Sequence, residues 1–111
     1  MDITVKDLGD GVAVLQLDGR LNMVTASCLR DHVGSAVSSG QNRIAVDLAG
    51  IEFIDSSGLG ALINGLKTAR QAGGDLRIAA PNDQVKLVLQ LTNMERLLTA
   101  YDSAETAFND D

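Results

Sequence analysis

The apolar residues of this chain recur with two spacings, one typical of strands and one typical of helices. Segments rich in β-branched residues and bounded by turn residues predict strands. These segments are residues 3–8, 12–19, 43–50, 75–80 and 96–101. The sequence Gly9-Asp10-Gly11 separates the first two, which predicts a β-hairpin. Residues 20–24 are predicted to be a loop, and the apolar run at 43–50 a strand covered on both faces.

Between the strands, apolar residues three and four positions apart predict amphipathic helices. The residues expected to face inward are Ala26, Leu29, Val33, Ala36 and Val37 in the first helix, Leu59, Leu62, Ile63, Leu66 and Ala69 in the second, and Val85, Val88 and Leu89 in the third. Residues 81–83 are expected to open the third helix, and Ser103 to start a short fourth one.

The order of these elements predicts the fold. Strands that alternate with helices imply a largely parallel sheet with right-handed crossovers. We expect an α/β fold, a single domain over residues 1–111. Its sheet is expected to be mixed and mostly parallel, with four to five strands, an N-terminal β-hairpin and about four helices. Residues 109–111 are expected to form a frayed tail.

Several helix ends are marked by residues that cap or break helices. Thr25 is expected to cap the first helix. Gly73 and Gly74 are expected to end the second, one of them in the left-handed conformation that needs no Cβ. Asn93, which tolerates the same conformation, is expected to close the third.

The composition narrows the classes of function. A chain of 111 residues, 45% of them hydrophobic, can form a core without disulfides. The net charge of −6 argues against binding to nucleic acid or to anionic lipid, both of which need a basic face. The single cysteine fits a reducing compartment, and no apolar run approaches the roughly 20 residues of a membrane span. We expect a cytoplasmic protein without membrane insertion.

The sequence FIDSSGLG, residues 53–60, carries the main candidate chemistry. It follows a predicted strand and precedes a helix, and in parallel sheets the loops at the carboxyl ends of strands carry function. Three interpretations are open. Asp55, Ser56 or Ser57 could cap the helix. A serine could be a nucleophile, or it could accept a phosphate, whose charge the helix N-terminus tolerates.

The nucleophile interpretation lacks a base. A nucleophilic serine needs one within hydrogen-bond reach, but the only histidine, His32, lies off the apolar stripe of its helix and is expected to be solvent-exposed. Cys28 is expected to be a small core residue, and its C-x3-H pair with His32 has no second pair to complete a zinc site. The glycines match no nucleotide-binding motif. We therefore expect neither an enzyme nor a cofactor.

Residues 44–79, with D-S-S-G-L-G after a strand, resemble the core of the STAS domain family, and in particular its bacterial anti-sigma factor antagonists. LDGRLNMVTAS, residues 17–27, resembles the family's segment before the first helix. PNDQVKLVLQLTNMERLL, residues 81–98, resembles its third helix and the segment after it. The resemblance covers nearly the whole chain and implies a single STAS-like domain.

The resemblance implies a partner-switching mechanism. An unphosphorylated antagonist binds a serine-kinase anti-sigma factor and so frees a sigma factor; phosphorylation releases the antagonist, and a PP2C-type phosphatase resets it. By position, the phosphoacceptor is Ser56, with Ser57 as the neighbouring hydroxyl and helix cap. The implied partner-binding residues are Asp55, Ser56, Ser57, Gly58, Leu59, Gly60 and Asn22. The two glycines are expected to allow close backbone approach. The alternative is a scaffold of a stress-sensing complex or an accessory subunit of a lipid transporter.

Three residues depart from the family pattern. Arg20 and Asn22 stand where the family usually has Glu and Asp near the phosphoacceptor. The loss of two negative charges is expected to change the partner or to weaken phosphotransfer. Leu87 stands where the family often has a polar or basic residue. With Leu91 it forms either an apolar contact surface or merely exposed leucines, which are common.

Overall fold

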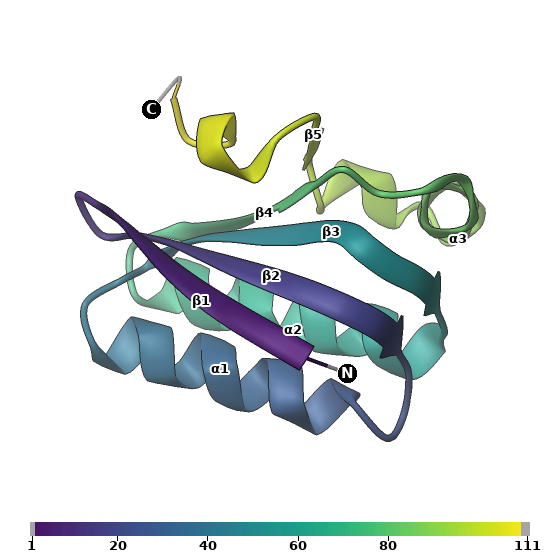
Figure 1. The fold of residues 1–111 in the computed structure, drawn as a ribbon, viewed down its shortest axis with the longest axis horizontal. Helices are drawn as coiled ribbons and strands as arrows, with labels where there is room; N and C mark the ends of the chain where they lie inside the picture. Colours follow the sequence, from purple (N-terminus) through teal and green to yellow (C-terminus); the bar gives the residue numbers. More distant parts are fainter. Residues whose placement is uncertain (1, 110–111) are drawn as a thin grey trace.

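Five strands form one mixed sheet in which the order of strands follows the order of the chain (Figure 1). In the computed structural model, which describes residues 2–109, they are β1 (Asp2–Gly9), β2 (Val12–Leu21), β3 (Arg43–Ile54), β4 (Asp75–Ala79) and β5 (Ala100–Tyr101). β1 and β2 pair antiparallel, which confirms the predicted hairpin. The pairs β2–β3, β3–β4 and β4–β5 are parallel.

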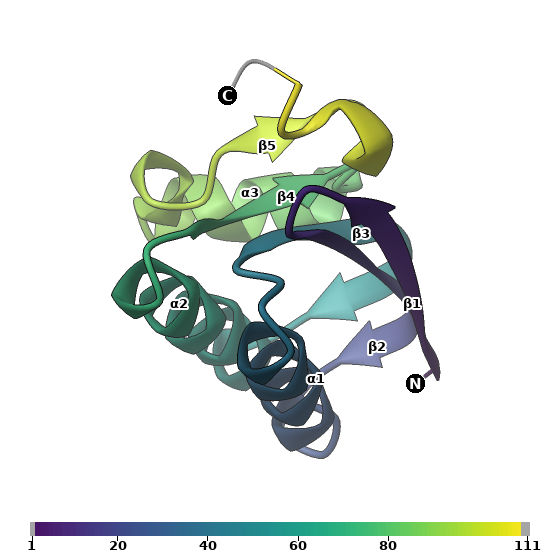
Figure 2. The ribbon, with the colours of Figure 1, turned by 90° about the vertical axis from the view of Figure 1, so that its left-hand side faces the viewer.

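Three α-helices connect the parallel strands: α1 (Ala26–Ser38), α2 (Ser56–Gln71) and α3 (Asp83–Leu91). Right-handed crossovers to successive neighbouring strands put the crossing helices on one face. Figures 1 and 2 show α1 and α2 side by side on that face, with the C-terminal segment after β5 on the other side of the sheet. α3 packs against the carboxyl end of β3.

The short fourth helix predicted to start at Ser103 is confirmed in position but not in type. The segment after Ser103 forms only the 3₁₀ turn η2 (Ala104–Thr106), and a second such turn, η1 (Met94–Arg96), follows α3. After η2 the chain buries Ala107 and Phe108 against the sheet face that α1 and α2 leave uncovered. Burying these side chains stabilises a bend at this point more than further helical hydrogen bonds would. Asn109 ends the described residues in a turn, and the rest of the predicted tail, 110–111, lies outside them.

β1 and β4 differ from their predicted ranges by at most one residue at either end, whereas β2 and β3 run further past their predicted ends and β5 is much shorter than predicted. β2 continues to Leu21, into the predicted loop 20–24, and β3 continues past Gly50 to Ile54. The extensions pair with each other, with Leu21 opposite Ile54, so each satisfies the other's backbone groups. The predicted strand 96–101 is reduced to Ala100–Tyr101, because η1 occupies its beginning.

The core is aliphatic and lies mainly between the sheet and the helices. Every predicted inward residue of α1 and α2 is buried or packs on this core, as do Val85, Val88 and Leu89 of α3. On the opposite face, Arg77 lies 4.4 Å from the ring centre of Phe108 and donates to the carbonyl of Ala107. Strand residues 44–46 are fully buried, which confirms a strand covered on both faces.

Three predictions concerned helix ends. The left-handed glycine after α2 and the left-handed Asn93 after α3 are confirmed, and the capping bond of Thr25 is not. Gly73 has φ +85° and Asn93 has φ +58°, both left-handed. Thr25 stands at the N-cap position of α1, but its side chain makes no capping bond. Its hydroxyl instead donates to the carbonyl of Arg20, 2.7 Å away, and so fastens the preceding loop.

Candidate functional site

The D-S-S-G sequence forms the start of α2. Asp55 is the N-cap in extended conformation, and its Oδ1 accepts a hydrogen bond from the backbone N–H of Gly58 at 2.8 Å. Ser56 is the first helical residue. The cap is therefore the carboxylate, and the expectation that Ser57 caps the helix is wrong. A carboxylate suits this place, because the helix N-terminus carries partial positive charge.

The two serines differ in exposure. Ser56 is exposed, whereas Ser57 is half-buried. Within residues 2–109 the hydroxyl of Ser56 makes no hydrogen bond, since the cap is already provided by Asp55. The Ser56 hydroxyl is accessible to a modifying enzyme at a point where a negative charge is electrostatically tolerated.

The two glycines after the serines do different things. An added Cβ on Gly58 would overlap the carbonyl group of Leu21, whose carbon would be 2.8 Å away. Gly58 thus allows α2 to lie directly against the end of β2, as expected for close backbone approach. Gly60 is exposed, and an added Cβ would meet nothing within 4 Å. Within the described chain the expectation of close approach is therefore wrong for Gly60.

Asn22 builds the loop that precedes α1. Its Oδ1 accepts from the backbone N–H groups of Val24, at 3.0 Å, and Thr25, at 3.2 Å. The Asp55 N–H donates to the carbonyl of Leu21, which places this loop beside the start of α2 (Figure 1). The amide oxygen of Asn22 is therefore used inside its own loop, where a carboxylate oxygen could accept the same bonds. The guanidinium of Arg20 makes a long, exposed ion pair with Glu52, at 3.9 Å.

Two apolar residues of this loop were not singled out from the sequence. Met23 and Val24 are 75% and 80% exposed. These two side chains lie next to the candidate site and contribute little to the core. The periodicity gave no signal for them, because a short loop has no repeating pattern against which an exposed apolar residue stands out.

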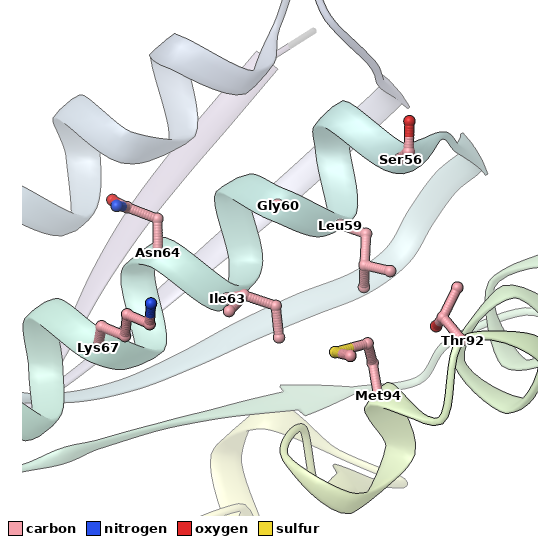
Figure 3. Close-up of a pocket in the computed structure, with 8 residues that line it drawn as sticks. All are labelled: Ser56, Leu59, Gly60, Ile63, Asn64, Lys67, Thr92 and Met94. Atoms are coloured by element: carbon pink, nitrogen blue, oxygen red, sulfur yellow. The ribbon is translucent and has the colours of Figure 1, made fainter.

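An open groove of about 440 Å³ runs from the start of α2 toward η1. It is lined by Ser56, Leu59, Gly60, Ile63, Asn64, Lys67, Thr92 and Met94. In Figure 3, Leu59 and Ile63 point toward Met94 across the groove, while Ser56 points away from them. The groove therefore has an apolar floor, and Ser56 stands at its rim.

The start of α3 is attached to the end of β3 by side-chain amides. The Ile54 N–H donates to Gln84 Oε1 and Gln84 Nε2 donates to the Ile54 carbonyl, both at 3.0 Å. Asn82 Nδ2 donates to the carbonyl of Ile51, also at 3.0 Å, while its Oδ1 caps α3. No local pattern in the chain indicates these bonds, because their partners are 30 or more positions apart. Leu87 and Leu91, on the same helix, are both exposed.

Comparison with known proteins identifies the family of this chain. A family model described as the STAS domain matches residues 5–107. The chain belongs to the STAS domain family. A Thermotoga maritima protein named "Putative anti-sigma factor antagonist" is 33% identical over 102 residues, which cover 91% of this chain and 90% of that protein. The anti-sigma F factor antagonist of Paenibacillus polymyxa is 28% identical, with 90% and 86% covered.

Solved structures agree with this assignment. A crystal structure of a Thermotoga maritima protein described in the same words matches this STAS domain with a TM-score of 0.87 at 32% identity. The match covers 97% of this chain and 92% of that one. The recognition of the family from the D-S-S-G-L-G sequence and its surroundings is thereby confirmed.

The remaining candidate residues of the STAS domain lie on α1. Cys28 is half-buried, so the expectation of a core cysteine is wrong. His32 is also half-buried rather than fully exposed; its Nδ1 lies 2.8 Å from the carbonyl oxygen of Cys28 and 3.8 Å from its Sγ. Among residues 2–109, no three His, Cys, Asp or Glu side chains gather as metal ligands would. Over the same residues, no helix combines the length and apolarity of a membrane span.

Proposed function

We propose that this STAS domain is an anti-sigma factor antagonist that switches partners through phosphorylation of Ser56. In the unphosphorylated form it binds a serine-kinase anti-sigma factor, and phosphorylation by that kinase releases it. A PP2C-type phosphatase restores the binding form. The names of the relatives, at 33% and 28% identity over about nine-tenths of the chain, support the antagonist role.

One observation carries the assignment of the acceptor. Ser56 is exposed, its hydroxyl has no hydrogen bond within the described residues, and the cap that a serine could supply is already supplied by Asp55. A kinase can reach this hydroxyl without breaking a structural bond. Ser57 is the poorer acceptor because it is half-buried.

The electrostatics explain how phosphorylation can change binding without unfolding the domain. A phosphoserine carries about −1.5 to −2 charges at neutral pH. At the first position of α2 the free N–H groups and the helix dipole partly offset that charge. Outside the helix it adds to the carboxylate of Asp55, so a partner that accepts the neutral surface meets concentrated negative charge. Repulsion of this kind lowers affinity for the wrong state.

The surface that a partner would meet surrounds Ser56. Asp55, Ser57 and Gly60 provide its part at the start of α2, where Gly58 and Leu59 are buried. Asn22 with Met23 and Val24 provides the adjoining loop. Gly60, one helical turn after Ser56, leaves open space above its backbone. Because Asn22 keeps the loop bonds without a charge, the substitution for the family's usual Asp is expected to alter partner choice rather than loop shape.

The test is the intact mass of the protein purified from its own cells, followed by mapping of the tryptic peptide 44–67. A gain of one phosphoryl group on Ser56, absent from Ser56→Ala and retained in Ser57→Ala, supports the proposal. Phosphate that persists in Ser56→Ala and disappears in Ser57→Ala overturns the acceptor assignment. Unmodified protein in all growth states, with no transfer from a co-encoded kinase, favours the scaffold or accessory role instead.

A further inference from the structure

The end of β3 leads directly into the proposed phosphoacceptor, yet only one of its edges is covered by another strand. β4 pairs with β3 only from Arg43 to Asp47. On the other edge, β2 accompanies β3 as far as Ile54. The last seven residues of β3, 48–54, therefore lack a strand partner on the β4 side.

The side chain of Gln84 takes the place of that missing strand at Ile54. Its Oε1 accepts from the Ile54 N–H and its Nε2 donates to the Ile54 carbonyl, both at 3.0 Å. A neighbouring strand would offer the same acceptor and donor pair to a residue whose N–H and C=O point to one edge. The carboxamide is thus a one-residue substitute for a strand, supplied by the first turn of α3.

Ile54 is the residue just before the cap. Asp55, which follows it, is held from the β2 side by the bond from its N–H to the Leu21 carbonyl. The main chain that leads into α2 is therefore hydrogen-bonded on both edges. Gln84 bonds to Ile54 on one edge, and Leu21 of β2 bonds to Asp55 on the other. Ser56 comes next, and its side chain makes no hydrogen bond within residues 2–109. Its place is set by the main chain, through the first turn of α2 that follows and these two attachments of the residues before it.

We propose that Gln84 is a positioning residue for phosphorylation of Ser56. This inference rests on the proposed function, in which Ser56 is the phosphoacceptor. By fixing the main chain of Ile54, the Gln84 amide presents the Ser56 hydroxyl in the orientation that the kinase uses. Small displacements of a reacting group can lower the rate of transfer by one to two orders of magnitude.

The test compares Gln84→Leu with two matched variants of the same helix. Leu is of similar length and removes both bonds to Ile54. Gln90→Leu makes the same change at an exposed position, and Val88→Ala weakens the packing of α3 on the core while keeping both hydrogen bonds from Gln84 to Ile54. The rate of Ser56 phosphorylation is measured in an extract of the source cells supplied with ATP, well below the unfolding temperature of each variant. Amide hydrogen exchange of Ile54 and Asp55 is measured in parallel.

In Gln84→Leu we expect faster exchange at Ile54, unchanged exchange at Asp55, and phosphorylation slowed about tenfold or more, with both control variants within about twofold of wild type. Should Gln84→Leu fail to fold, Gln84→Glu serves in its place. It can still accept from the Ile54 N–H, but it sets an oxygen against the Ile54 carbonyl, and the same slowing is expected.

Two results would overturn the role of Gln84 while leaving the proposed function standing. One is a wild-type rate of phosphorylation in the Gln84 variants, and the other is an equal loss of rate in Val88→Ala, which would indicate general destabilisation. Absence of phosphate on Ser56 in the wild type overturns the proposed function and this inference together.

Discussion

At the amino ends of β3 and β4, neighbouring turns touch through their main chains. Gly74 lies against the Asn42 carbonyl so closely that no Cβ fits, and the Asp75 N–H donates to that carbonyl. At the carboxyl ends of the parallel strands, side chains make most of the connections. Asn22, Asp55 and Gln84 each bond to backbone groups there, and Ser56 lies exposed among them.

The amino ends of these strands are held by main-chain contacts that the fold requires, whereas the carboxyl ends are held by side-chain bonds and form a surface that a partner can contact. A turn fixed by backbone contact tolerates almost no change, because neither side can move away. A loop fixed by side-chain bonds loses about 0.5–1.5 kcal/mol per bond when one is removed, and the chain remains folded. The end of the sheet that is held by side chains can therefore vary between relatives and carry a specific partner surface.

The largest effect is expected at the backbone-packed end. Gly74→Ala places a methyl group into the Asn42 carbonyl, and we expect the free energy of unfolding to fall by about 3 kcal/mol or more. Urea denaturation measures this change. Gly9→Ala is the control, since φ there is +82° with open space around it, and about 1–2 kcal/mol of loss is expected. Equal losses in both variants would contradict the steric explanation.

The next effect compares two glycines of α2. Gly58→Ala should lower the free energy of unfolding by about 2–3 kcal/mol, because the methyl group meets the Leu21 carbonyl. Gly60→Ala should raise it by about 0.5–1 kcal/mol, because Ala is the better helix former and the space is open. Thermal unfolding followed by circular dichroism distinguishes the two. A loss of stability in Gly60→Ala would contradict the open space around Gly60.

A third prediction concerns charge at the two ends of the molecule. Ser56→Asp should change the free energy of unfolding by less than about 1 kcal/mol, since a carboxylate suits a helix N-terminus. Under the proposed function, it should weaken binding to the anti-sigma factor about tenfold or more, because the added charge lies within the contact surface. Ser38→Asp adds the same charge at the end of α1. There we expect unchanged binding and a small loss of stability, because negative charge is unfavourable at a helix C-terminus.

The smallest effect is expected from Glu105. The hydroxyl of Ser103, 2.8 Å away, lowers the pKa of the Glu105 carboxyl, and Lys6 at 3.7 Å lowers it further. A lowered pKa in the folded state means that this contribution to stability is present above the ordinary pKa of Glu and is lost as the pH falls through the folded value. The melting temperature of Glu105→Gln should therefore depend slightly less on pH below 5 than that of wild type. A stronger pH dependence in the variant would contradict this assignment.

Much of the fold could be predicted from the sequence because its signals are local. The hairpin follows from the Gly9-Asp10-Gly11 turn, and the inward faces of α1 and α2 follow from apolar spacing. The length of β3 could not be predicted, because Ile51 to Ile54 form a strand only through pairing with β2. The helix predicted after Ser103 is a single 3₁₀ turn for a similar reason, since Phe108 is buried against a sheet face that the local sequence does not describe.

The candidate site also has one feature that the local sequence predicts and one that it does not. The place of D-S-S-G at the start of a helix could be read from the chain, since capping residues and a helical pattern stand next to each other. Which of the three side chains caps the helix could not, because Asp55, Ser56 and Ser57 are all good N-caps. The structure assigns the bond to Asp55, and so leaves Ser56 exposed.

The succession of strands and helices, the aliphatic core and the position of the acidic, serine-containing turn between β3 and α2 follow from the order of residues along the chain. These features depend on residues a few positions apart, whose spacing and conformational preferences act locally. The bonds of Gln84 to Ile54 and the contact of Gly58 with Leu21 follow from the folded arrangement alone. Those contacts join residues about 30 or more positions apart, and they exist only because pairing of the strands and packing of the helices bring the two segments together.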